Sequence, residues 1–351
     1  QADWLVGMNA TRAYTTKYFK KLTVGRVQTP TLAMLVERAG QISNFQKEKY
    51  FNVELDCDGI PAVKPKIFDP DEAEQLRSRC QGSEAIVNAV KETEKKVKAP
   101  RLYDLTTLQR EANRIYGMTA KQTLDTAQSL YEKKLITYPR TDSQYLTEDM
   151  EQTARNVVRQ IYEKYQLTGP FDQPEQPDVK KVMNNSKVTD HHAIIPTMEL
   201  ASCHLDELKS WEEKILFLIA VHTVMAMSKD HIYQETEIEV ECQGEVFKTK
   251  GKTVLQDGWK IFENCFKNKD RMAIADPDQE MKERIPKVTK GQTFYAVAAE
   301  KTEHFTSPPK PYSEDTLLAA METAGNKEFD EDTEKKGLGT PATRAGIIEK
   351  L

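Results

Sequence analysis

The segment Lys134–Ser143, KLITYPRTDS, sets a tyrosine directly before a proline, with an arginine two residues after the tyrosine. Proline pushes the preceding residue out of helical geometry, so we expect Tyr138 on extended backbone, where its side chain is presented rather than packed along a helix. Residues two apart on an extended segment face the same side, so we expect Arg140 beside Tyr138. The question raised by the segment is what a phenol presented in this way does.

A tyrosine and an arginine on one side of an extended segment have two interpretations. A free phenol has a pKa near ~10, so a nucleophilic tyrosine needs a neighbour such as a guanidinium, which stabilises the phenolate and binds a phosphate oxygen. The alternative is a half-buried strand residue beside a surface charge, and the spacing alone favours this alternative. The segment by itself leaves a catalytic role for Tyr138 and Arg140 open.

Two further motifs suggest chemistry less strongly. His191 and His192 are adjacent, so their side chains point apart, and no third ligand is near in sequence; a phosphate contact is therefore favoured over a metal site. Gly251-Lys252-Thr253 resembles the end of a phosphate-binding loop, but six residues separate Gly244 from Gly251 and the segment has the pattern of a strand. We therefore expect no ATP site and no nucleotide ligand.

The composition, with 38% hydrophobic and 30% charged residues in 351, is typical of a globular protein of two or three domains. Five widely spaced cysteines with no CxxC pair indicate a reducing, cytoplasmic setting, with neither a disulfide framework nor a zinc ribbon. The longest apolar run, Ile215–Met227, predicts a buried helix and no membrane partner. The chain opens on Gln1 without a leader, so we expect it to be a piece of a longer protein.

Charge is distributed unevenly along the chain. The net charge is −5, which on its own argues against a nucleic-acid partner. Residues 1–50, however, contain eight Lys or Arg and three acidic residues, a local balance of +5. The acidic surplus lies elsewhere, notably in 146–175 and 314–334, so a basic surface near the start of the chain is compatible with the overall charge.

Hydrophobic periodicity predicts alternating helical and β-rich regions. Helices are expected within 1–45, at 105–116, from a capping box at Thr119, in a capped run at 147–165, after Ser313, and from Thr340-Pro341; strands are expected at 51–57 and 235–257, with turns at Asp58-Gly59 and Gln243-Gly244; loops are expected at 169–177 and 325–339. The order helical, β-rich, helical, β-rich, helical indicates nested domains, in which a helical module interrupts a β-rich one.

Six blocks of sequence give the opening segment its context. They are DWLVGMNATRAYT (3–15), VGRVQTPTLAMLVER (24–38), KLITYPRTDS (134–143), DHHAIIPT (190–197), PPKPYSEDTLLAAME (308–322) and GLGTPATRAGIIEKL (337–351). In this order they closely resemble the type IA DNA topoisomerases, specifically the topoisomerase III branch.

The resemblance implies an α+β multidomain toroid with helical, winged-helix-like base and tyrosine domains and a split β-rich arch. The implied ranges are 1–49 and 306–351 for the base, 50–98 and 199–305 for the arch, and 99–198 for the tyrosine domain.

The resemblance also implies a role for each site residue. Tyr138 would attack a phosphodiester of single-stranded DNA and hold the 5′ phosphate, which needs no ATP; Arg140 would steady that phosphate and His191 would contact the phosphate or the phenol. The residues implied to contact DNA or orient the loop are Arg12, Arg26, Gln28, Asp142, Ser143, Thr340 and Arg344. A monomer bound to single-stranded DNA, relaxing or decatenating DNA, is the implied state.

Relatives of this family begin with a Toprim domain whose acidic cluster holds Mg²⁺. The chain opens after the position of that domain, so we expect Mg²⁺ only in the full-length enzyme, no metal site in these 351 residues, and no activity of the chain alone.

Three alternatives remain at this stage. One is a non-catalytic clamp that binds single strands or merely opens and closes, and another is a helix-turn-helix at 105–135 that reads duplex DNA. A tyrosine recombinase is disfavoured because no His-x-x-Arg occurs in the sequence.

Overall fold

The computed structural model describes residues 2–167, 177–188, 190–263, 286–325 and 337–351. The α-helices are α1 (Ala2–Tyr18), α2 (Gln28–Ser43), α3 (Pro70–Cys80), α4 (Leu105–Tyr116), α5 (Ala120–Glu132), α6 (Glu151–Tyr165), α7 (Ser210–Ala226), α9 (Glu314–Thr323) and α10 (Pro341–Ile348). The strands are β1 (Lys49–Cys57), β2 (Ile60–Ile67), β3 (Ala85–Val97), β4 (His231–Cys242), β5 (Glu245–Gln256), β6 (Thr293–Phe294) and β7 (Ala298–Phe305).

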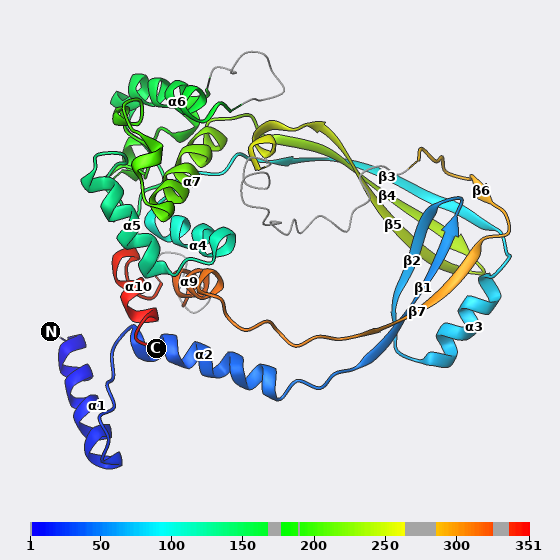
Figure 1. Ribbon diagram of the computed structural model, residues 1–351. Helices are drawn as coiled ribbons and strands as arrows, with labels where there is room; N and C mark the ends of the chain where they lie inside the picture. The colour runs from blue at the N-terminus through cyan, green and yellow to red at the C-terminus, as the bar shows by residue number, and fades with distance from the viewer. Residues whose placement is uncertain (1, 168–176, 189, 264–285, 326–336) are drawn as a thin grey trace.

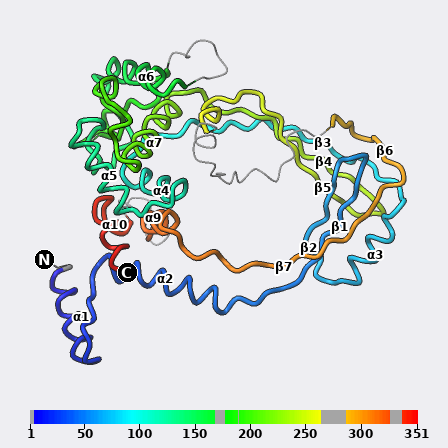
Figure 2. Tube along the Cα trace, in the orientation of Figure 1, coloured from blue at the N-terminus to red at the C-terminus, as the bar shows by residue number. Residues whose placement is uncertain are grey.

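The elements are arranged as a ring (Figures 1 and 2). A helical body containing α4 to α7, α9 and α10 forms one side, and the sheet with α3, which we call the arch, forms the other. The long strands β3, β4 and β5 connect the two along the top, whereas α2 and the segments flanking β1 and β7 connect them along the bottom. The α1 helix stands apart from the remaining helices.

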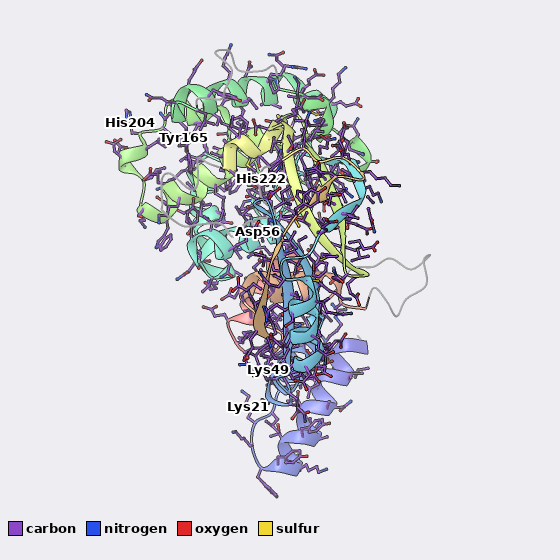
Figure 3. The ribbon with its side chains drawn as sticks, turned by 90° about the vertical axis from the view of Figure 1, so that its right-hand side faces the viewer. Lys21, Lys49, Asp56, Tyr165, His204 and His222 are labelled. Atoms are coloured by element: carbon purple, nitrogen blue, oxygen red, sulfur yellow. The ribbon has the colours of Figure 1, made fainter. Side chains whose placement is uncertain are left out.

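The ring is narrower from the side. In the view turned by 90° (Figure 3), Lys21 and Lys49 lie in the lower part of the molecule, and Tyr165 and His204 lie in its upper part. No helix in the described part of the chain combines the length and the apolar character that crossing a membrane would require.

The arch is one antiparallel sheet in the order β6-β3-β4-β5-β2-β1-β7. The predicted turns are confirmed: Cys57 pairs with Ile60 across Asp58-Gly59, and Cys242 pairs with Glu245 across Gln243-Gly244. The left-handed backbone of both turns suits a two-residue hairpin between twisted strands. Helix α3 contributes Ala73, Leu76 and Cys80 to the core beneath this sheet.

A second core fills the helical body. The predicted buried helix at 215–227 is confirmed as α7, and it shares its core with residues of α4, α5 and α6. This core also includes Leu200, residues between Ile215 and Met227, and Phe262 from the segment after β5, all within the range that the resemblance assigns to the arch. The five-range division into domains stays a prediction, with this packing favouring a boundary nearer Met227 than Leu200.

Local sequence signals set several helix boundaries. Asp104 and Thr107 form a capping box at the start of α4, Gly117 ends that helix in left-handed geometry (φ 66°), and Thr119 caps α5 as predicted. The predicted capped helix at 147–165 is partly wrong, because a 3₁₀ turn (Glu148–Met150) precedes α6 and the Thr147 side chain makes no capping hydrogen bond. The predicted loops at 169–177 and 325–339 lie largely outside the described residues.

The upper junction between arch and helical body centres on Asp230. Its carboxylate accepts hydrogen bonds from the backbone N–H of Ala99 (3.0 Å) and from Lys181 Nζ (3.2 Å), and it pairs with Lys96 (3.3 Å). Gly258 packs against the same residue, since a Cβ built there would lie 2.3 Å from the Asp230 carbonyl oxygen. The exit from β3 and the entry to β4 are thereby held together.

The lower junction is a pair of extended segments. Glu48 and Thr306 exchange hydrogen bonds just beyond the last β1–β7 pair, Lys49 with Phe305. Further along, Arg38 of α2 donates to the Lys310 carbonyl oxygen (2.8 Å) and lies over the Tyr312 ring (4.3 Å). Two paired extended segments therefore connect the arch to the rest of the chain at the lower end, whereas the hydrogen-bonded strands β3, β4 and β5 do so at the upper end.

Candidate functional site

Tyr138 lies on non-helical backbone, as predicted, just after α5 ends. The turn after α5 is closed by hydrogen bonds from Lys134 N to the Tyr131 carbonyl oxygen (2.8 Å) and from Leu135 N to the Leu130 carbonyl oxygen (2.9 Å). Lys134 adopts left-handed geometry (φ 60°), which reverses the chain direction. The tyrosine segment therefore leaves the helix in a fixed direction.

Thr137 fastens this segment to the strand-like residues 193–196. Its N–H donates to the Ile195 carbonyl oxygen (2.9 Å), its Oγ1 donates to the Ala193 carbonyl oxygen (2.8 Å), and the same Oγ1 accepts from Ile195 N (3.0 Å). Ile136 and Pro196 form an antiparallel bridge beside them. The segments KLITYPRTDS and DHHAIIPT are thus one structural unit.

Three aromatic rings meet at Tyr138. The His191 ring centroid lies 4.3 Å from that of Tyr138 at an interplanar angle of 44°, and the Tyr131 ring lies at 5.3 Å and 76°, an edge-on arrangement. Tyr138 is half-buried and His191 is exposed. Among the residues the structure describes, none forms a hydrogen bond with the Tyr138 hydroxyl, which leaves that oxygen available to a ligand.

The residues after Arg140 hold the loop in place. Thr141 is buried: its carbonyl oxygen accepts from Leu105 N (3.1 Å), and its Oγ1 contacts the His191 carbonyl oxygen (3.3 Å). Ser143 is 4% exposed and donates from Oγ to the Lys187 carbonyl oxygen (2.9 Å), whereas Asp142 is exposed. Ser143 therefore contacts protein groups that fix the loop, in keeping with an orienting part.

Arg140 is exposed and adds positive charge near the start of α5. The hydrogen bond from Lys121 to Asp125 raises the pKa of Lys121, while Arg140 lies close enough to oppose that change. The charges of Lys121 and Arg140 are therefore close enough to interact, and positive charge near the tyrosine segment is suited to an anion.

The other predicted DNA contacts are spread over the lower part of the molecule. Arg12 is exposed on α1, Arg26 is exposed in the turn before α2, and Gln28 is the first residue of α2. Thr340 is exposed at the start of α10, where its N–H donates to Thr343 Oγ1 (3.0 Å). The structure gives no direct contact, within its described residues, between any of these and Tyr138.

Arg344, which the resemblance assigns to DNA binding, is buried among protein groups in this structure. It is 3% exposed, and its guanidinium donates to the carbonyl oxygens of Leu338 (3.0 Å) and Gly339 (3.2 Å) and to Thr106 Oγ1 (3.0 Å). In this conformation it joins the loop before α10 to the start of α4. An arginine beside a Gly-rich loop gives no sequence signal of such burial.

A second cluster of polar groups lies near the upper junction. Tyr103 stacks on His222 at 3.6 Å and donates to Glu111 (2.8 Å), while His222 Nε2 bonds to the Arg101 carbonyl oxygen (2.7 Å). Burial lowers the pKa of His222 and raises that of Tyr103 well above its ordinary value. These groups line a cavity of about 360 Å³, but they already satisfy one another, so they provide no free nucleophile.

The sequence did not single out Tyr131, Thr137 or Thr141. Tyr131 has a weak signal, since it precedes Tyr138 by seven residues at the end of a predicted helix. The threonines have none, because their importance depends on pairing with residues 191–195.

A metal has no obvious place in the described part of the chain. Its His, Cys, Asp and Glu side chains form no group of three or more that could hold an ion. The resemblance places Mg²⁺ on a domain outside these 351 residues, so none of the side chains described above is assigned to it.

Comparisons with known proteins agree on one family. The family model described as DNA topoisomerase matches residues 1–351. The chain is 40% identical over 376 residues to DNA topoisomerase 3 of Bacillus licheniformis and 39% identical over 370 residues to DNA topoisomerase 3 of Bacillus subtilis. Each alignment includes all of this chain and 50% of the relative, so the chain spans about half the length of these relatives.

A solved structure supports the same conclusion for the fold. Full-length topoisomerase I from Thermotoga maritima matches with a TM-score of 0.72 and 25% identity, over 99% of this chain and 54% of that chain. The predicted α+β, topoisomerase-type fold is confirmed by this match.

Proposed function

This chain belongs to the type IA DNA topoisomerase family, in its topoisomerase III branch, and from that membership we propose that Tyr138 cleaves and reseals single-stranded DNA during strand passage. The family changes DNA topology, which makes its members isomerases. The observation that carries the assignment of Tyr138 is its ring, half-buried on non-helical backbone between Tyr131 and His191, with a hydroxyl that no described residue engages.

The chemistry exchanges one phosphodiester for another. The Tyr138 oxygen attacks phosphorus, the bond to the 3′ oxygen breaks, and the phenol proton ends on the departing 3′ hydroxyl. The DNA 5′ phosphate stays on the tyrosine until the 3′ hydroxyl reverses the step. Because a diester replaces a diester, the step is close to isoenergetic and needs no ATP.

The surrounding residues have distinct parts in this proposal. Arg140, with Lys121 nearby, stabilises the negative charge on phosphate, and His191 contacts the phosphate or the phenol. Arg12, Arg26, Gln28 and Thr340 contact the backbone of the single strand, and Asp142 with Ser143 orients the loop. For Arg344, the buried contacts support an indirect part, holding the loop that presents Thr340.

We propose that a Toprim domain with Mg²⁺, outside these 351 residues, completes the site in the full-length protein, which acts as a cytoplasmic monomer. When bound, the metal would supply positive charge at the reacting phosphate. The isolated chain is then expected to bind single-stranded DNA without relaxing supercoils. Relaxation of plasmid DNA by the purified chain with Mg²⁺ would refute this.

Covalent capture tests the main proposal. Full-length protein is mixed with single-stranded DNA labelled at its 3′ end and denatured quickly; the label should remain on the protein, and peptide mapping should place it on Tyr138. The same DNA labelled at its 5′ end should release the label. Tyr138→Phe should abolish the adduct, whereas Tyr295→Phe, on an exposed arch residue, should leave it unchanged.

The outcomes separate enzyme from clamp. Binding of single strands with no adduct would favour a non-catalytic clamp, and an adduct on another residue would refute the assignment of Tyr138. Retention of the 5′ label instead of the 3′ label would refute the proposed polarity.

A further inference from the structure

We propose that Tyr131 is a positioning residue for the reaction, which holds the Tyr138 ring in the orientation from which its oxygen attacks phosphorus. The inference rests on the proposed function of Tyr138 and adds a residue that the family resemblance did not assign.

The position of Tyr131 is the first observation. It belongs to the last turn of α5 and is 39% exposed, whereas its neighbour Leu130 is fully buried in the helical core. Tyr131 is therefore not needed to fill that core. The ring contact that the structure gives it is the edge-on contact with Tyr138, at 5.3 Å and 76°. This geometry is favourable for two aromatic rings.

The rigidity of the connection is the second observation. The Tyr131 carbonyl oxygen accepts from Lys134 N (2.8 Å), and the Tyr138 segment is tied through Thr137 to Ala193 and Ile195. Both rings thus come from backbone that is hydrogen-bonded within one unit. Because the backbone under both rings is fixed, the Tyr131 ring does not move along with the Tyr138 ring. The contact between them therefore limits the rotation of the Tyr138 ring.

His191 does not make Tyr131 redundant. The His191 ring lies 4.3 Å from the Tyr138 ring and is tilted by 44° to it. His191 is exposed, and in the proposed function it contacts the phosphate or the phenol. If His191 turns to contact phosphate, Tyr131 is the ring that remains against Tyr138. We therefore expect Tyr131 to act through its aromatic ring and His191 to act through its ring nitrogen atoms.

Restricting a half-exposed side chain to its reactive orientation increases the rate of the chemical step without changing binding of the DNA. An aromatic contact of this kind is expected to contribute about 2- to 12-fold to the rate of adduct formation. The hydroxyl of Tyr131 has no part in this account, so phenylalanine should replace it.

The experiment compares Tyr131→Leu and Tyr131→Phe in the full-length protein. The rate of adduct formation on 3′-labelled single-stranded DNA is measured in a single turnover at saturating DNA, and DNA affinity is measured separately by fluorescence anisotropy with Tyr138→Phe as the background. We expect Tyr131→Leu to slow adduct formation about 2- to 12-fold with unchanged affinity, and Tyr131→Phe to retain the wild-type rate. Tyr295→Leu, which removes an exposed ring far along the chain, is the matched control.

Each other result has a defined meaning. A wild-type rate for Tyr131→Leu overturns the inference, as does an equal loss for Tyr131→Phe, which would assign the effect to the hydroxyl. A loss of rate that follows a loss of affinity also overturns it, because Tyr131 would then bind DNA bases. If the wild-type protein itself forms no adduct, the proposed function of Tyr138 is refuted. The wild-type measurement therefore distinguishes failure of the proposed function from failure of the inference about Tyr131.

Discussion

Replacing Glu212 by glutamine is expected to weaken the helical body by about 3 kcal/mol at pH 7. Glu212 lies in the first turn of α7 and is 3% exposed. Its carboxylate accepts hydrogen bonds from Lys133 Nζ (2.6 Å), Ser129 Oγ (2.6 Å) and Lys209 N (3.0 Å). Burial raises the pKa of this carboxyl, but the three donors together outweigh burial and lower the pKa from 4.5 to about 2. That difference corresponds to about 3 kcal/mol of stability.

The pH dependence follows from the direction of this shift. Because the pKa of Glu212 is lower in the folded than in the unfolded chain, the stabilisation is complete above about pH 5 and is lost as the pH falls toward about 2. The advantage of wild type over Glu212→Gln should fall by about 1 kcal/mol at pH 4 and by about 2 kcal/mol at pH 3. Below the folded pKa the two proteins should be equally stable.

The assay is urea unfolding of the chain at pH 7, 4 and 3, with amide hydrogen exchange to locate the change. Peptides from α5 and α7 should lose protection in the variant, and peptides from the arch should not, since they belong to a separate core. Asp125→Asn is the matched control, because its pair with Lys121 (2.8 Å) is solvent-exposed and is expected to contribute at most about 0.5 kcal/mol. A loss below about 1 kcal/mol at pH 7, or a difference that does not change with pH, would refute the reasoning.

Three further changes test other parts of the structure. Gly258→Ala should destabilise the upper junction by more than about 2 kcal/mol in urea unfolding, because the new Cβ meets the Asp230 carbonyl. Gly244→Ala, at a position that is also left-handed but faces open space, should cost about 1 kcal/mol. Equal costs for the two variants would contradict this explanation. Burial raises the pKa of Asp104 to about 6, so ionisation of this carboxyl destabilises the folded chain as the pH rises from about 4 to 6. Asp104→Asn should therefore be more stable relative to wild type at pH 7.5 than at pH 4.5. The reverse order would be inconsistent with burial as the cause of the shift. Tyr138→Phe should shift the unfolding free energy by less than about 0.5 kcal/mol, since the hydroxyl lacks a partner among the described residues, and a larger loss would reveal a structural bond.

Features encoded by a few adjacent residues were predictable from the sequence. The stop at Gly117, the capping box at Thr119 and the hairpin at Gln243-Gly244 all have a local physical cause, and the structure confirms them. The non-helical backbone at Tyr138 follows in the same way from the proline after it.

Features that depend on distant partners were not predictable. The contact of Tyr138 with His191 requires residue 137 to pair with residues 193 and 195, which no local pattern specifies. Arg344 looks like any surface cation until Thr106 and the loop before α10 enclose it. Leu200 and the buried residues of α7 share a core with α4, α5 and α6, a packing that no local pattern in the sequence specifies.

The attachment of the arch determines where the gene could be redesigned to separate the arch from the helical body. The strands that leave it end as neighbours at both places, Val97 opposite His231 and Lys49 opposite Phe305. Either pair of ends could therefore be closed by a short turn in a redesigned gene without breaking a rung of the sheet. The arch between these ends has a core of its own, but Phe262, from the segment after β5, belongs to the core of the helical body. An arch exchanged between relatives would therefore have to bring a residue that fills the place of Phe262.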